Sequence, residues 1–248
     1  MKLVFEEASL FKRYVDGIAV LVDEAEFLID ETGLSLKATD PSQISLVDFS
    51  LPKSSFKKFE VKEPTKIGVD LNYLNQVMSR AKTKDSLSLS ISEDKSKLNL
   101  VFTGQSKRSF LIPLLDIDTA DLPLPKIDFD SEVKIRASAF QDSLKDANLI
   151  STHLVLSVVD DSFVVKANSS KGNLENIYTK SDDAIISLKA GQEVSSMFPL
   201  DYLVSVTKAT SNDTELVIKL KSNAPVEISY AIGEGKLKYF LAPRIETD

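Results

Sequence analysis

The chain has 248 residues, 43% of them hydrophobic, and its 30 basic and 37 acidic residues give a net charge of −7. This composition predicts one or two folded domains and excludes a disordered or membrane-spanning chain, because no apolar run approaches the roughly 18 residues that a spanning helix needs. The absence of cysteine and the single histidine, His153, exclude disulfides, thiolate chemistry and two-histidine metal motifs.

The first half of the sequence predicts a short strand, Leu3–Phe5, followed by a helix. The helix is indicated by an apolar stripe at helical spacing, formed by Phe11, Val15, Ile18 and Val22. Two strands at 26–30 and 34–38 then meet at a turn that contains Gly33. These features predict a mixed α+β arrangement.

The remainder of this half predicts further strands and a second helix near residues 71–82. Serine alternates strictly with leucine or isoleucine over residues 86–91, which is typical of a half-buried antiparallel strand. The acidic residues soon after Met1 argue against a signal peptide, so we expect a soluble intracellular protein.

The second half repeats the first at a constant offset of 129 residues. Residues 71–91 align with 200–220 without a gap, Phe11 aligns with Phe140, and the hairpin recurs at 154–159 and 163–167. A helix near 200–209 is predicted as the counterpart, in the second copy, of the helix near 71–82. After the strand pair 86–91 and 215–220 the offset falls to 128, so a turn of different length must absorb a one-residue slip. The chain is therefore predicted to be a duplicated domain.

The predicted boundaries are an N-terminal domain over 1–113, a connector over 114–128 and a C-terminal domain over 129–248. The connector carries Pro123 and Pro125, which fix an extended path and disfavour helix. Its apolar Leu122 and Leu124 have no obvious core to enter, which invites a binding role.

No enzyme site emerges from the sequence, and no cofactor or metal is predicted. The connector aspartates Asp116, Asp118 and Asp121 fail the EF-hand pattern, because Asp121 and Ile127 stand where glycine and glutamate belong. The pairs Asp160–Asp161 and Asp182–Asp183 favour turns over acid–base chemistry. Gly233–Gly235 indicates a hairpin, and His153 a partly buried structural imidazole rather than a catalytic base.

The predicted helices expose basic residues opposite their apolar stripes, although aspartates share these faces. The acidic chain as a whole repels nucleic acid, so a DNA-binding function requires its basic residues to gather on one face. Ordinary solvated helix faces are the simpler interpretation, and the sequence alone leaves both open.

The C-terminal segment, residues 235–246, strongly resembles the ending of the proliferating-cell-nuclear-antigen family of DNA sliding clamps. The segment 40–47, the start of the second helix at 68–71 and the segment 207–210 agree with the same family. The resemblance runs in order along the whole chain, including its duplication and the position of the connector. The sequence Asp-Pro-Ser at residues 40–42, the lack of cysteine and the short tail favour the archaeal type.

The resemblance implies an α+β DNA-clamp fold in which each domain has two β-α-β-β-β units, with helices inside and sheets outside. Three two-domain subunits then close head to tail into a ring around duplex DNA. Such a protein is a processivity factor without catalytic activity: it needs only weak, sequence-independent phosphate contacts because the ring holds DNA topologically.

Family positions carry over to a set of DNA-facing cations: Lys12, Arg13, Arg80, Lys82, Lys84, Lys145 and Lys208. The sequence departs from better-known members at Ala19 and Leu149, where those carry a basic residue and a histidine.

The resemblance also implies a pocket in which polymerase, clamp loader, ligase and nuclease dock short peptides. Its residues here are Thr39, Gln43, Ile44, Leu46, Leu122, Leu124, Pro125, Pro225, Phe240, Ala242 and Pro243. Edge strands of neighbouring subunits pair in this family, and the matching segments are Ser109, Phe110, Leu111 and Ile112 with Glu175, Asn176, Ile177 and Tyr178.

Three alternatives remain open from the sequence. They are one subunit of a heterotrimeric or checkpoint clamp, a polymerase accessory protein that does not encircle DNA, and an unrelated α+β enzyme with a carboxylate site. An archaeal clamp is expected in the cytoplasm near the nucleoid and a eukaryotic one in the nucleus. No membrane partner is expected.

Overall fold

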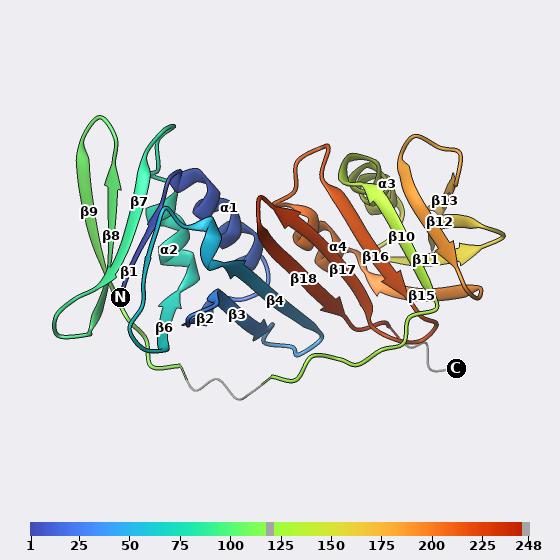
Figure 1. The fold of residues 1–248 in the computed structure, drawn as a ribbon. Helices are drawn as coiled ribbons and strands as arrows, with labels where there is room; N and C mark the ends of the chain where they lie inside the picture. Colours follow the sequence, from blue (N-terminus) through green and yellow to red (C-terminus); the bar gives the residue numbers. More distant parts are fainter. Residues whose placement is uncertain (118–121, 245–248) are drawn as a thin grey trace. The chain divides into compact units, whose positions relative to one another are not determined.

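The fold is described from a computed structural model for residues 1–117 and 122–244 (Figure 1). Part of the predicted connector, with Asp118 and Asp121 of the rejected calcium motif, lies outside the described residues. So do residues 245–248, which include the last two positions of the resembling tail. Apart from these segments, the chain forms two compact units, of which the first contains 1–41, 47–123 and 232–237 and the second 42–46, 124–231 and 238–248.

The described residues form four α-helices, two in each half of the repeat: α1 (Ala8–Ile18), α2 (Leu71–Met78), α3 (Ala137–Ile150) and α4 (Leu200–Thr207). The strands before the connector are β1 (Lys2–Phe5), β2 (Glu24–Ile29), β3 (Gly33–Thr39), β4 (Ser45–Pro52), β5 (Lys58–Glu60), β6 (Thr65–Asp70), β7 (Ser86–Ile91), β8 (Lys97–Thr103) and β9 (Lys107–Pro113), with a short 3₁₀ turn η1 (Lys53–Ser55).

The strands after the connector are β10 (Ser131–Arg136), β11 (His153–Val159), β12 (Ser162–Ser169), β13 (Gly172–Thr179), β14 (Ile185–Ala190), β15 (Val194–Pro199), β16 (Glu215–Leu220), β17 (Val226–Ile232) and β18 (Gly235–Leu241). Each half therefore runs twice through β-α-β-β-β, with β5 and β14 added. This order confirms the predicted α+β clamp fold and its internal repeat.

The first unit places its two helices against each other beside antiparallel sheets (Figure 1). One sheet has the strand order β5-β1-β7-β8-β9, and a second run has the order β4-β3-β2-β6. Helix α1 forms because Phe11, Val15 and Ile18 recur on one stripe, and all three are buried. Helix α2 begins where the carboxylate of Asp70 accepts the backbone N–H of Tyr73 at 2.8 Å.

The second unit repeats this arrangement, with α3 packed against α4. Its strands run in the orders β14-β10-β16-β17 and β13-β12-β11-β15. The stripe of α3 buries Phe140, Leu144 and Ala147, as the sequence predicts. Strand β13 is an edge strand of its sheet, as β9 is in the first unit, and both carry exposed apolar residues.

The one-residue slip between the halves leaves the strand pairing intact. Leu89 faces Leu100 in the first half, and Ile218 faces Ile228 in the second. All four side chains are buried. Ser90 pairs with Asn99 across the eight residues 91–98, whereas the aligned Lys219 pairs with Glu227 across the seven residues 220–226. Counted between paired residues, the first connection is one residue longer, and it absorbs the slip that would otherwise reverse one strand.

Three helices end earlier than their patterns predict. Helix α1 ends at Ile18, and the predicted stripe member Val22 is buried in the turn beyond it. Helix α2 ends at Met78 rather than near 82. Beyond it the backbone N–H groups of Arg80 and Ala81 donate to the carbonyls three residues earlier, at 3.0 Å each, so the last turn tightens. Helix α4 ends at Thr207 instead of 209.

The turn predictions for the acidic pairs are confirmed. Asp160 and Asp161 both adopt positive φ, 49° and 56°, and form the two-residue hairpin between β11 and β12. The carboxylate of Asp182 accepts the backbone N–H of Thr179 at 2.6 Å within the next turn. Gly233, with φ of 57°, lies in the turn between β17 and β18.

Candidate functional site

The predicted DNA-facing cations fall into two groups in the structure. Lys12 and Arg13 lie on α1, Lys145 lies on α3, and Lys208 is the first residue beyond α4. Lys12 is paired with Asp16 at 2.5 Å and Lys145 with Asp142 at 2.8 Å. The internal pairing of Lys12 and Lys145 reduces the net positive field of these helix faces.

The second group, Arg80, Lys82 and Lys84, lies beyond the end of α2 rather than on it. The guanidinium of Arg108 on β9 donates to the carbonyl of Arg80 at 2.7 Å and is paired with Asp85. Asp85, almost fully buried, also accepts the backbone N–H of Lys82 at 2.8 Å. This segment is thus fastened to edge strand β9, a link that the sequence pattern did not reveal.

The predicted interface segments coincide with the two edge strands. Ser109, Phe110, Leu111 and Ile112 belong to β9, and Leu111 keeps 54% of its surface exposed. Glu175, Asn176, Ile177 and Tyr178 belong to β13, and Ile177 is 56% exposed. An exposed apolar residue on an unpaired strand edge is a feature that soluble proteins normally avoid, so each edge suits a partner strand.

The predicted peptide pocket is mainly built from the second unit. The tail returns beside residues 42–46, since the backbone N–H of Ala242 donates to the carbonyl of Ile44 at 2.8 Å. Leu46 and Phe240 are buried, whereas Gln43 is exposed. The other members in this unit, Leu124, Pro125, Pro225 and Pro243 among them, are half-buried, while Thr39 and Leu122 belong to the first unit.

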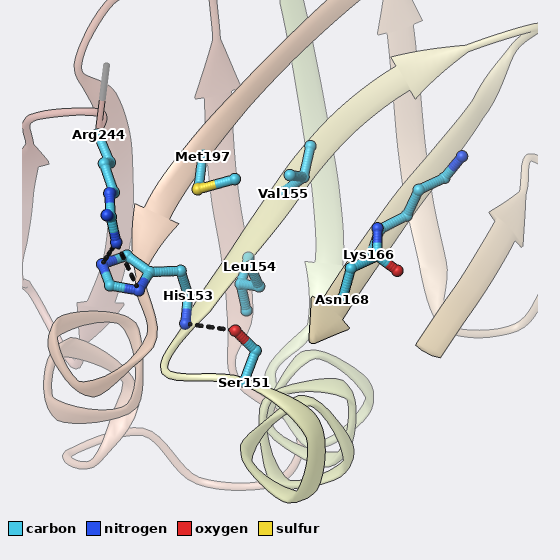
Figure 2. A pocket seen from close by; sticks show the side chains of 8 residues that line it. All are labelled: Ser151, His153, Leu154, Val155, Lys166, Asn168, Met197 and Arg244. Carbon is cyan, nitrogen blue, oxygen red and sulfur yellow. Dashed lines mark hydrogen bonds between the residues drawn. The ribbon is translucent and has the colours of Figure 1, made fainter. Parts of the chain in front are cut away.

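The tail continues to a small pocket of about 200 Å³ around His153 (Figure 2). The backbone N–H of Arg244 donates to the carbonyl of Met197 at 2.8 Å, and its guanidinium nitrogen lies 3.2 and 3.3 Å from the two ring nitrogens of His153. Burial and, to a smaller extent, the charge of Arg244 lower the pKa of His153. Figure 2 shows Lys166 pointing away from this ring. Its ammonium group is paired with Glu175 at 2.7 Å.

This neighbourhood confirms that His153 is half-buried, and it adds Arg244, which sequence reasoning did not connect to it. The two residues are 91 positions apart, and only the return of the tail brings them together. Over residues 1–117 and 122–244, no group of three or more histidine, aspartate or glutamate side chains is arranged to hold a metal ion. Within the same ranges, no helix is long and apolar enough to cross a membrane.

Comparison with known proteins identifies the family. Residues 1–133 match the N-terminal domain of proliferating cell nuclear antigen, and residues 123–245 match its C-terminal domain. Archaeal proteins named DNA polymerase sliding clamp are similar over nearly the whole chain. That of Thermococcus gammatolerans is 34% identical, covering 99% of this chain and 98% of the relative, and that of Methanococcus vannielii is 36% identical, covering 96% of each.

Solved structures agree with the sequence comparison. The chain superposes on the proliferating cell nuclear antigen of Thermococcus kodakaraensis with a TM-score of 0.94, covering 98% of this chain and 99% of that one, at 24% identity. It also superposes on that of A. fulgidus, solved with the C-terminal region of FEN-1 bound, with a TM-score of 0.90 at 28% identity and coverage of 100% and 99%. The chain therefore belongs to the proliferating cell nuclear antigen family, and its named relatives are archaeal.

Proposed function

We propose that this protein is a DNA sliding clamp, a processivity factor that encircles duplex DNA as a trimeric ring and tethers replication and repair enzymes. The observation that carries the proposal is the family match over both halves of the chain, together with relatives named DNA polymerase sliding clamp over 96–99% of this chain. The proposed role is one of binding, and it requires no catalytic residue.

Ring closure follows from the two exposed strand edges. β9 of one copy pairs with β13 of the next, and a head-to-tail contact of this kind closes when its rotation suits three subunits. The unpaired backbone N–H and C=O groups of both edges then form hydrogen bonds, and the exposed side chains of Leu111 and Ile177 become buried. The helices line the hole, and Lys12, Arg13, Lys145 and Lys208 contact phosphates weakly and without regard to sequence.

The peptide pocket recruits partners. Half-buried apolar residues such as Leu124 and Pro243 receive aromatic and aliphatic anchors, and the backbone of the tail offers strand-type hydrogen bonds. The complex of a related clamp with the C-terminal region of FEN-1 supports this assignment. We expect polymerase, clamp loader, ligase and nuclease to use the same pocket.

The decisive experiment measures how far a cognate polymerase extends a long primed circular template with the clamp and its loader. The clamp should lengthen the products strongly, and cutting the circle should release the clamp because it is held by topology. Unchanged product length with an active loader would contradict the proposal.

The pocket is tested by replacing Leu124 with serine and titrating a peptide copied from the C-terminus of a cognate FEN-1 nuclease. We expect at least about tenfold weaker binding, because a half-buried apolar contact is lost at the anchor site. Leu28→Ser, at a 36%-exposed leucine on β2, is the matched control and should bind normally.

A further inference from the structure

The end of the C-terminal tail is held at two neighbouring points of the second unit. The backbone N–H of Arg244 donates to the carbonyl of Met197 on β15 at 2.8 Å. One nitrogen of its guanidinium lies 3.3 Å from Nδ1 and 3.2 Å from Nε2 of His153 (Figure 2). A nitrogen in the ring plane could approach both only by crowding the carbon between them, so the guanidinium lies over the face of the ring. Arg244 is therefore fixed through its backbone and through its side chain.

This contact sets the direction of the last described residues of the tail. The N–H groups of Ala242 and Arg244 are both used within the chain, by the carbonyls of Ile44 and Met197. Alternate residues of an extended segment direct their backbone groups to opposite edges. The carbonyl of Pro243 therefore faces the other edge of the tail, the edge that the proposed pocket offers to a partner strand.

The backbone part of this anchor is repeated in the first unit, whereas the side-chain part is not. The N–H of Leu115 donates to the carbonyl of Gly68 at 2.9 Å, and Gly68 aligns with Met197 at the offset of 129. Glu24 stands there in place of His153, and the bridging residue is a leucine instead of an arginine. The backbone bridge alone thus returns the chain after the last strand. The stacked side chains are present only in the half whose tail borders the proposed pocket.

We propose, building on the peptide pocket proposed above, that His153 is a positioning residue for partner binding. Through Arg244 it keeps the tail in the extended form that a partner peptide pairs with, and it does so only while its imidazole is neutral. A tail that is already ordered raises the affinity, because less conformational freedom is lost on binding. Protonation of His153 places two positive charges in contact, and the guanidinium then leaves the ring.

The groups around His153 keep its imidazole neutral near pH 7. Arg244 reaches it from the tail, Asp201 lies on α4, and Lys166 lines the same pocket from β12. Burial and, to a smaller extent, Arg244 lower the pKa of His153, whereas Asp201 acts in the opposite direction. Lys166 is paired with Glu175 at 2.7 Å and points away from the ring, so its charge is offset. The imidazole therefore becomes charged only as the pH falls below about 6.5.

The test is a titration of the full chain with the C-terminal peptide of a cognate FEN-1 nuclease, from about pH 8 to about pH 5. We expect binding to weaken about three- to tenfold at the acid end, since the tail must then be ordered by the partner. His153→Phe keeps a flat ring that cannot be protonated, so its affinity should stay high throughout. The ratio of the two affinities at each pH cancels any titration of the peptide itself.

Two further variants remove the contact at every pH. His153→Lys carries a permanent charge and Arg244→Gln removes the guanidinium, so both should bind as weakly at about pH 8 as the native chain does at about pH 5. Glu24→Lys is the matched control, because it puts a lysine at the aligned, exposed position of the first half and should bind normally. Hydrogen exchange at the amide of Arg244, measured without peptide, should quicken in His153→Lys and stay slow in Glu24→Lys.

The outcomes separate the anchor from the pocket. A native chain that binds no peptide at any pH overturns the pocket and the role of His153 in it. Tight binding that depends on pH equally in the native chain and in His153→Phe overturns the anchor and leaves the pocket intact. Unchanged affinity in both His153→Lys and Arg244→Gln does the same. Circular dichroism at each pH checks that every variant stays folded, and Arg244→Gln changes only an exposed side chain.

Discussion

Helices α1 and α3 occupy the same place in the repeat, yet the signs of their charged residues are exchanged. Arg13 aligns with Asp142, and Asp16 aligns with Lys145. Each helix still pairs its charges internally, Lys12 with Asp16 and Lys145 with Asp142. The buried stripes, in contrast, agree: Phe11 and Phe140 align and are both fully packed. Duplication preserved what folds each half, and divergence changed what each half presents.

The two exposed edges also differ in the charged residues beside them. β9 is bordered by a basic segment, whereas the helix beside β13 carries Asp142 and Asp146 together with Lys145, which is paired with Asp142. The first half and the second half therefore differ most where neighbouring copies are proposed to meet. Substitutions at matched positions in the two halves give the sharpest tests of which features the halves share and which they do not.

The largest effect is expected in the shared cores. Phe11 packs on Phe5 with ring centroids 4.9 Å apart, and Phe140 packs near Phe163 at 6.2 Å. Replacing either with alanine should lower the free energy of unfolding by about 3–5 kcal/mol, because a large cavity is left. Hydrogen exchange should localise each loss to the unit that carries the change; equal loss in both units would contradict separate cores.

The next effect concerns the edges. Ile177→Asp should weaken the trimer by about 100-fold, because a charge would replace an apolar residue at the proposed β9–β13 joint. Leu111→Asp should have a similar effect from the opposite edge. The control is Ile186→Asp on β14, where the side chain is 46% exposed on an edge strand that takes no part in the proposed β9–β13 joint. Light scattering that shows equal dissociation for all three variants would argue against the β9–β13 joint.

A smaller effect should follow when the second half is made to resemble the first. Tyr230 stands where the first half has Phe102, and its hydroxyl lies 3.0 Å from the carbonyl of Val206 and 2.9 Å from the hydroxyl of Tyr239. Tyr230→Phe should cost about 1–2 kcal/mol in thermal or denaturant unfolding, since buried polar groups lose their partner. Tyr73→Phe, at a 43%-exposed tyrosine, should change stability little.

The smallest effect is a pH dependence. His153, which aligns with Glu24 of the first half, has a lowered pKa in the folded chain because of burial and Arg244. The unfolded chain therefore binds the proton more readily than the folded chain. The contribution of neutral His153 to folding stability is complete above about pH 6.5, and it is lost as the pH falls through that value toward the folded pKa. We expect the free energy of unfolding, measured with urea across this pH range, to depend less steeply on pH in His153→Gln than in the native chain. An unchanged slope would place the titration elsewhere.

Much of the fold was predictable, because periodicity and turn residues act locally. The stripe of Phe140 and Leu144, the alternation of Leu87 and Leu89 and the hairpin at Asp160 each depend on neighbours a few residues away. The helix ends were less predictable. The end of α2 is marked by a change to backbone bonds three residues back, at Arg80 and Ala81, and apolar spacing does not encode this change.

The surfaces were only partly predictable. The resemblance located β9, β13 and the tail. The sequence pattern, in contrast, predicted a helix near 71–82 that would include Arg80 and Lys82, whereas α2 ends before them. Their attachment to β9 depends on Arg108 and Asp85, whose contacts span more than 20 residues of sequence. The meeting of Arg244 with His153 likewise required the tail to fold back along the second unit.

The one-residue difference in turn length has a consequence for exchange of segments between the two halves. Copying residues 86–103 as a block into the second half would carry both strands with their own turn, and Leu98 and Phe102 would still point into a core. Copying a block that ends inside the turn would shift β17 by one position and turn Ile228 and Tyr230 toward solvent. The turn thus acts as a barrier to recombination between the copies, and chimeras should be cut outside it.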